Sequence, residues 1–384
     1  MSPPSTAATA GFVDAHTHLR STAYADHGIG GTSFEEALLR MSAMTPVPVE
    51  DDVFVACVGL LEQGVTTVQV IFHTFGDPDE YRAALHATIQ GIERSGIRAL
   101  VVLGTTDQAE FLPVGVTSPR LPAFCQVTRR LSAAEFGDVV STATQDYPGI
   151  SFGVGPVGPQ WCSDSLLGTL GDIATQGYRV HAHFLESAAQ RSWAPGAVLS
   201  RMQTHGLLGP QTSLAHAVWC SDKELQILSD LGVGLVTCPH SNRLLQAGRA
   251  PVDDWLRRGI TVGVGLDSAD PQARPVDVAR LALSPTEAER ALTEGGLSCA
   301  GFSHVNDRVV WTDRELGVVD SVEIDGTTVI SHGRFRDHST VEAARERITE
   351  TMNRDAANRK SRHSSIDAVI HDYHSHIAGG HDES

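Results

Sequence analysis

Eight short apolar runs alternate with helix-forming stretches along this 384-residue chain, and this alternation restricts the fold more than any other feature. The runs cover residues 12–19, 65–72, 98–103, 150–155, 179–183, 213–216, 233–238 and 260–265. Many of their residues are β-branched or otherwise apolar, as expected for parallel strands that are buried on both faces. Strands separated by helices predict a (β/α)8 barrel of the TIM type, with a doubly wound α/β sheet as the alternative.

Polar residues recur at or just past the carboxyl ends of these runs, which favours the barrel. They are His16 and His18, His181 and His183, Glu186, His216 and Asp267. His16 and His18 share one face of their strand because side chains alternate with a period of two. In a barrel the strand ends meet at one mouth. Several imidazoles and two carboxylates would then lie close together, as a catalytic metal requires.

The rest of the chain predicts smaller units around the barrel. We expect a tail at residues 1–10, the barrel at 11–305, a partial β-sandwich at 306–340, and a helix with a His-rich tail at 341–384. Asp325-Gly326 is typical of the turn between two antiparallel strands. Residues 104–131 are long for a loop, which predicts a lid or binding element. His374-Ser375-His376 repeats the His-x-His pattern in a polar segment, so a solvated terminus is favoured there over a metal site.

Charge and cysteine usage restrict the partners and the compartment. A net charge of -17 argues against binding to nucleic acid or to an anionic membrane, because both need a basic surface. No apolar run approaches the ~18 residues that a membrane span needs, and the first ten residues lack signal-peptide features. The six cysteines include no C-x-x-C pair, which predicts reduced thiols and a cytoplasmic protein.

The motifs resemble those of the amidohydrolase superfamily. The most similar branch contains cytosine and guanine deaminases, S-adenosylhomocysteine and methylthioadenosine deaminases, and triazine chlorohydrolases. The resembling segments are residues 12–19 (FVDAHTHL), 181–187 (HAHFLES), 213–216 (SLAH), 238–242 (CPHSN) and 262–268 (VGVGLDS). They stand in the family's order, and the resemblance covers about residues 11–332.

The resemblance implies a role for each polar strand-end residue. His16, His18, His183 and Asp267 would hold one divalent metal, and Asp267 would also take a proton from the attacking water. Glu186 would protonate a ring nitrogen and later carry a proton to the leaving group. His216 would orient the hydroxide or polarise the carbon under attack.

Lysine positions bear on the number of metal ions. Binuclear members of the superfamily usually bridge two metals with a carboxylated lysine on the fourth strand. Residues 151–156 contain no lysine, and Lys223 and Lys360 lie elsewhere. We therefore expect one divalent ion per chain, Zn²⁺ or alternatively Fe²⁺, because three imidazoles and a carboxylate suit both.

The implied activity is that of a metal-dependent hydrolytic deaminase, a hydrolase acting on carbon–nitrogen bonds other than peptide bonds. Metal-bound hydroxide would attack an amino-substituted sp² carbon of a small nitrogen heterocycle and release ammonia. The alternative is a hydrolase of the same branch with another leaving group: a chlorohydrolase, an N-dealkylating enzyme or a cyclic-amide hydrolase. A non-catalytic metal-binding or scaffold protein would be expected to lack Glu186, His216 and Asp267.

Several candidate site residues could instead have a purely structural role. His73, Gln160, Trp161 and His240 follow strands two, four and seven, so they are predicted to line the substrate pocket, with ordinary packing as the alternative. His181 is expected behind the ligands or in the core. The pair His16 and His18 could be hydrogen-bonded without a metal, Glu186 could be a helix N-terminal acid, and Asp267 could be a turn residue.

Two departures from the family concern its periphery. Relatives usually carry a longer β-sandwich segment before the first barrel strand, whereas only about ten residues precede the first predicted strand here. A half sandwich leaves strand edges exposed, and a homodimer would cover them. The loop after Asp267 is reduced to Ser268-Ala269-Asp270-Pro271, so the family does not indicate a specific substrate.

Overall fold

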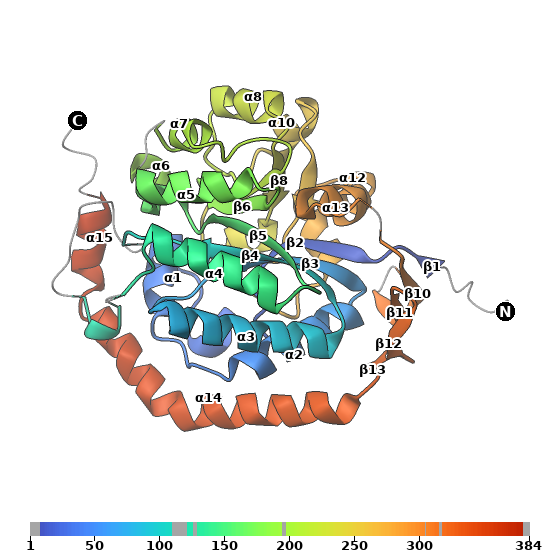
Figure 1. Ribbon diagram of the computed structural model, residues 1–384. Coiled ribbons are helices and arrows are strands. Elements are labelled where there is room, and N and C mark those ends of the chain that lie inside the picture. Colours follow the sequence, from blue (N-terminus) through green and yellow to red (C-terminus); the bar gives the residue numbers. More distant parts are fainter. Residues whose placement is uncertain are drawn as a thin grey trace.

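Eight parallel strands form a barrel in this computed structural model, which describes residues 8–109, 121–125, 129–193, 197–303, 305–314 and 317–378 (Figure 1). The strands are β2 (Phe12–Thr17), β3 (Val65–Phe72), β4 (Arg98–Thr105), β5 (Ser151–Pro156), β6 (Arg179–Phe184), β7 (Thr212–His216), β8 (Gly234–Thr237) and β9 (Val262–Val264). Each pairs with the next one in sequence, from β2 to β9. A doubly wound sheet would reverse its strand order, so the predicted barrel is confirmed.

The last barrel strand lies against the first. The backbone N–H of Asp267, just after β9, donates to the carbonyl oxygen of His16 in β2 at 3.0 Å. Gly265 permits this approach, because a Cβ at that position would lie 2.7 Å from the Cβ of His16. The two ends of the sheet therefore bring His16 and Asp267 side by side.

Helices cover the outside of the barrel. They are α2 (Val49–Glu62), α3 (Pro78–Ser95), α4 (Ala133–Asp146), α5 (Asp164–Ala174), α7 (Ala197–Thr204), α8 (Asp222–Asp230), α10 (Val252–Arg257), α11 (Pro275–Arg280), α12 (Pro285–Arg290), the π-helical η4 (Ala291–Gly295) and α13 (Gly296–Ala300). Helix α3 shows why these ends could be predicted. It begins with a capping box between Asp77 and Glu80 and ends at Gly96, which has a φ of 75°. Within the described residues, no helix is long and apolar enough to cross a membrane.

Shorter elements occupy the connections between these strands and helices. They are η1 (Tyr24–His27), α1 (Phe34–Met41), η2 (Ala123–Cys125), η3 (Pro159–Trp161), α6 (Ala188–Trp193) and α9 (Pro239–Leu244). The predicted long loop at 104–131 is only partly described, since residues 110–120 and 126–128 lie outside the described part.

A separate antiparallel sheet stands beside the barrel, with the strand order β1-β10-β11-β12-β13 (Figure 1). Its strands are β1 (Ala8–Thr9), β10 (Asp307–Asp313), β11 (Val318–Ile324), β12 (Thr327–Ser331) and β13 (Arg334–Phe335). Asp325 and Gly326 both have positive φ and join β11 to β12, as the turn prediction requires. Residues 1–10 were predicted to be a tail, whereas Ala8 and Thr9 pair with β10 because its edge offers free backbone groups.

The chain ends in a long helical arm. Helix α14 (His338–Asp367) runs along α2 and continues into α15 (Ile370–Ala378) (Figure 1). Arg347 of α14 donates two hydrogen bonds, of 2.6 and 2.7 Å, to the carboxylate of Asp51 in α2. Tyr373 of α15 is buried, so the expected solvated terminus is wrong at this position. His381 and the side chain of His376 lie outside the described part of the chain.

Candidate metal centre

Tight turns follow the barrel strands that supply the predicted site residues. Leu19 after β2, Leu185 after β6, His216 at the end of β7 and Asp267 after β9 have φ values of 52°, 42°, 69° and 59°. Residues other than glycine rarely adopt positive φ, and such conformations concentrate at functional sites. These turns direct polar side chains from four strand ends toward one point.

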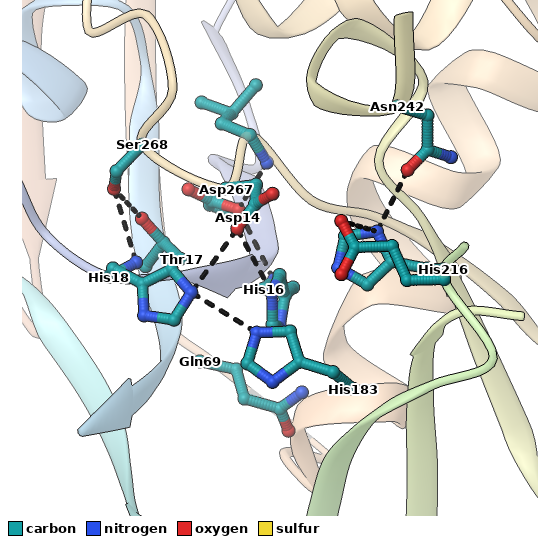
Figure 2. A network of polar contacts seen from close by, with 12 residues as sticks. Asp14, His16, Thr17, His18, Gln69, His183, His216, Asn242, Asp267 and Ser268 are labelled. Atoms are coloured by element: carbon teal, nitrogen blue, oxygen red, sulfur yellow. Dashed lines mark hydrogen bonds and ion pairs between the residues drawn. The ribbon is translucent and has the colours of Figure 1, made fainter. Parts of the chain in front are cut away.

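Five predicted residues meet there (Figure 2). His16, His183, His216 and Asp267 each offer a ligand atom, and these atoms all lie within 4.8 Å of one another. The half-buried His18 stands beside them, with its Nε2 3.2 Å from His183 Nε2 and 3.3 Å from Asp267 Oδ1. His16 Nε2 also lies 3.3 Å from Asp267 Oδ1.

Hydrogen bonds behind the cluster orient two of the imidazoles. His183 Nδ1 lies 2.7 Å from the carbonyl oxygen of Val157. A carbonyl only accepts, so Nδ1 of His183 carries the proton and Nε2 keeps a lone pair that faces the cluster. His216 Nδ1 lies 2.9 Å from Asn242 Oδ1, which leaves His216 Nε2 as a lone pair in the same way.

His16 is supported by a further histidine. Its Nδ1 lies 2.8 Å from Nε2 of His181, whose own Nδ1 is 2.8 Å from Ser213 Oγ and 2.9 Å from the Gln69 amide nitrogen. His181 therefore lies behind His16, where the sequence placed it, and outside the tight cluster.

The donor set fits a divalent cation. Nε2 of His216 is buried and has no hydrogen-bond partner within the described residues, and the buried Nε2 of His16 faces the Asp267 carboxylate. Imidazole lone pairs that converge on a carboxylate, with other acceptors behind them, are the arrangement expected of a zinc-type site.

Burial sets the charges of the cluster. It lowers the pKa of His18, lowers that of His183 well below its usual range, and lowers that of His216 to about 4. These imidazoles are therefore neutral near pH 7, the form that binds metals. Burial opposes ionisation of Asp267, but hydrogen bonds with His16 and His18 hold its pKa well below the ordinary value.

Glu186 is a second carboxyl group, and its pKa is shifted in the opposite direction from that of Asp267. It follows β6, is 1% exposed, and its Oε1 lies 3.6 Å from His216 Nδ1. Burial raises its pKa well above the ordinary value, and the negative charges of Asp267 and Glu35 raise it further. Its Oε2 is buried without a hydrogen-bond partner in the described part of the chain. A protonated Glu186 can therefore donate a proton toward the cluster.

The four predicted pocket residues are placed differently from one another. Gln160 and Trp161 are buried in η3, and both polar atoms of the Gln160 amide have no hydrogen-bond partner among the described residues. The His73 ring packs edge-on against His18, with 5.7 Å between ring centroids. His240 is half-buried and faces Asp270, with 3.6 Å between Nε2 and Oδ2.

Trp161 also belongs to an apolar group that we call the mouth cluster. Its buried members are Tyr24, Ile29, Phe34, Ala37, Trp161, Leu245 and Ala269. Burial raises the pKa of the Tyr24 hydroxyl, and the nearby charge of Asp267 raises it further, so this cluster adjoins the polar site.

Sequence reasoning missed the residues that orient the others. Asn242 lies within the motif at residues 238–242, from which only His240 was selected. Asn242 itself lies in α9, so the available signal was the place of this motif just after a strand. Gln69 in the middle of β3 and Ser213 near the start of β7 contact His181 inside the barrel, and no strand-end pattern distinguishes them.

Comparison with known sequences gives one family. The profile described as "Amidohydrolase family" matches residues 7–308. The 5-methylthioadenosine/S-adenosylhomocysteine deaminase 2 of Archaeoglobus fulgidus is 27% identical over 67% of this chain and 58% of its own length. The 5'-deoxyadenosine deaminase of Methanosarcina mazei is 35% identical over 29% of this chain and 27% of its own length. The matched regions thus span less than two thirds of these relatives.

Solved structures share the fold. Atrazine chlorohydrolase from Arthrobacter aurescens TC1, as a mutant complexed with zinc and atraton, superposes with a TM-score of 0.73 at 20% identity, covering 89% of this chain and 88% of that one. An adenosine deaminase from Xanthomonas campestris with bound zinc gives a TM-score of 0.70 at 21% identity, with coverages of 91% and 87%.

Proposed function

Because the chain belongs to the amidohydrolase family, we propose that it is a metal-dependent hydrolytic deaminase. It would be a hydrolase of carbon–nitrogen bonds other than peptide bonds and would release ammonia from an amino-substituted sp² carbon of a nitrogen heterocycle. One observation carries the proposal: neutral imidazoles and an ionised Asp267 converge beside a buried Glu186 whose pKa is raised.

The proposed metal ligands are His16, His18, His183 and Asp267, holding one divalent ion. Zinc is favoured because two proteins of this fold contain it, and Fe²⁺ is the alternative for the same donors. When bound, the ion would lower the pKa of a bound water toward ~7 and so supply a nucleophile at neutral pH. Asn242 holds Nδ1 of His216, so His216 would present Nε2 to the attacking water or to the substrate.

Two carboxyl groups with opposite pKa shifts divide the proton transfers. Asp267, with a low pKa, accepts the proton that the attacking water loses. Glu186, with a raised pKa, donates its proton to the ring nitrogen. It then takes a proton from the hydroxyl group on the attacked carbon as the carbonyl forms, and delivers that proton to the departing amine. The proton held by Asp267 afterwards returns to Glu186 and resets both groups. Water is consumed, the carbon–nitrogen bond breaks, a carbonyl group remains on the ring and ammonia leaves.

The substrate would bind between the metal site and the mouth cluster. We assign this role to His73, Gln160, Trp161 and His240. The aromatic surface of Trp161 suits a planar ring, and the unpartnered amide of Gln160 suits a ring heteroatom. Two relatives are named as deaminases of adenine nucleosides, which makes such compounds the first to test.

A hydrolase with another leaving group is the alternative, because loss of chloride, of an alkylamine or of a ring amide needs the same attack on an sp² carbon. A screen for ammonia release separates the two. Zinc-loaded protein would be offered adenosine, 5'-deoxyadenosine, cytosine, guanine and amino- and chloro-triazines, with E186Q as the inactive control. Ammonia release by the wild type alone supports deamination, whereas chloride or alkylamine release without ammonia would favour the alternative.

Location and assembly complete the proposal. No disulfide joins any of the six cysteines, which suits the reducing cytoplasm. The strands β1 and β13 end the small sheet, and a homodimer would cover such edges. We divide the chain into the barrel at 11–305, the partial sandwich at 306–340 and the arm at 341–384. Light scattering on the purified protein would test the dimer.

A further inference from the structure

Helix α1 lies between the mouth cluster and the C-terminal arm, by which we mean α14 and α15. One face of α1 places Phe34 and Ala37 in the mouth cluster. The opposite face places Leu39 in a second apolar cluster with Ile366 and Tyr373 of the arm. The helix thus connects the last elements of the chain to the wall of the site.

Polar contacts join α1 to the arm as well. The hydroxyl of Tyr373 donates to the backbone carbonyl of Glu35 at 3.1 Å. Arg40 lies 2.7 Å from the carboxylate of Asp367, and His374 lies 3.0 Å from that of Glu36. Helix α1 therefore has several anchors on the side away from the metal centre.

The side chain of Glu35 extends toward the site instead. Glu35 is 6% exposed, and its carboxylate accepts a hydrogen bond from the hydroxyl of Ser187, the residue after Glu186. Ser187 Oγ in turn accepts from the backbone N–H of Gln190 at 3.1 Å. The Gln190 amide oxygen accepts from the backbone N–H of Glu186 at 2.9 Å. These bonds enclose the turn that carries Glu186.

The burial of the Glu35 carboxylate is unfavourable in itself and calls for a functional explanation. Burying a charged group costs free energy, and an apolar side chain of similar size is often as stable or more stable. The turn that Glu35 holds contains Leu185, whose positive φ is unfavourable for a leucine. An external restraint on that turn would keep the catalytic carboxyl group in one place.

We propose that Glu35 is a positioning residue, which acts through Ser187 to hold Glu186 at the proton-transfer position. This inference rests on the proposed function of Glu186. It requires the hydrogen bond to Ser187, and it assigns no direct contact between Glu35 and substrate.

The kinetic test uses four single variants and one double variant of the zinc-loaded enzyme, on the substrate that the screen finds. E35A and S187A should lower kcat roughly 10- to 100-fold while KM changes by less than about 3-fold, since misplaced groups cost about this much. E35Q should stay within about 3-fold of the wild type, because its amide oxygen still accepts the Ser187 hydroxyl. The double variant should be no slower than S187A alone, because S187A already removes the hydrogen bond between Ser187 and Glu35.

The matched control is E36A, which changes the next residue of α1 and removes only contacts with Arg40 and His374. Its kcat should equal that of the wild type. Zinc content and melting temperature identify a variant that fails to fold. If E35A fails to fold, the kcat values of S187A and E35Q are compared instead. The inference would be overturned if E35A and E36A lowered kcat equally, or if the effects of E35A and S187A on kcat simply multiplied in the double variant.

A second readout needs no turnover. In the zinc-loaded protein, hydrogen exchange of the amides of residues 186–190 should be roughly tenfold faster in E35A and S187A, and unchanged in E36A. If no compound is hydrolysed, the proposed function fails, and this exchange still decides whether Glu35 orders the Glu186 turn. Wild-type exchange in E35A would contradict the inference even in an active enzyme.

Discussion

The Nδ1–H of His183 donates a hydrogen bond of 2.7 Å to the carbonyl oxygen of Val157, the residue just past the end of β5. This contact turns the other ring nitrogen of His183 toward His18, whose Nε2 lies 3.2 Å away. Two nitrogen atoms at that distance need a shared proton or a cation between them. The pairing of a ligand histidine with a backbone carbonyl is common at metal sites.

Replacing the proposed acid should abolish most of the activity and leave the metal in place. E186Q keeps the shape of the side chain and removes the proton that it would donate, so kcat should fall by about 10²- to 10⁴-fold. Steady-state ammonia release and zinc content would be measured together. Full activity in E186Q would show that another group transfers the proton.

Removing the partner of His216 should slow the reaction by a smaller factor. N242A leaves Nδ1 of His216 without its acceptor, so the ring can rotate or change tautomer, and kcat should fall roughly 10- to 100-fold. S241A, the preceding residue, serves as the control. Loss of zinc from N242A would indicate that His216 is itself a ligand.

Acid should destabilise the fold partly through His27, a buried residue between Thr22 and Thr45. Burial lowers the pKa of His27 from an ordinary 6.5 to about 4. Between these values the unfolded chain binds the extra proton, so stability rises with pH. The contribution is complete above pH 6.5 and is lost as the pH falls toward 4. With solvent screening, we expect roughly 2 kcal/mol.

Urea denaturation at several pH values would measure this effect. The free energy of unfolding of H27Q should fall less between pH 6.5 and 4.5 than that of the wild type. H86Q, which replaces a more exposed histidine on α3, controls for the general response to acid. Parallel pH profiles for wild type and H27Q would exclude His27 as the source.

The arm should be held to the barrel by Arg347. R347A removes both hydrogen bonds to Asp51, whose pKa those bonds hold below its ordinary value. We expect a loss of about 1 kcal/mol, because the arginine is half exposed. R345A, two residues earlier on α14, removes more exposed pairs and should change stability less. Equal melting temperatures for wild type and R347A would contradict this role.

The barrel could be predicted because its signals are local. The run at 65–72 is β-branched and entirely buried, and the capping residues around 78–95 mark both ends of a helix. The meeting of His16, His183, His216 and Asp267 could be predicted as well, because barrel topology brings strand ends together whatever their separation in sequence.

The arm and the supporting contacts depend on interactions that no local pattern encodes. Few residues of α14 are buried, namely Val341, Ala344, Ile348 and Ile366, so its sequence shows no strong apolar face. Its attachment relies on ion pairs with residues some 300 positions earlier, such as Arg347 with Asp51. Asn242 and Glu35 act through side-chain directions that only the folded chain defines.

Metal stoichiometry tests the central claim most directly. Elemental analysis of purified protein, after dialysis against trace zinc, should give about one divalent ion per chain. The double variant H16A/H183A should bind none at the same zinc concentration, and H86Q should bind as the wild type does. Two tightly bound ions per chain, none, or undiminished binding in H16A/H183A would contradict the mononuclear site.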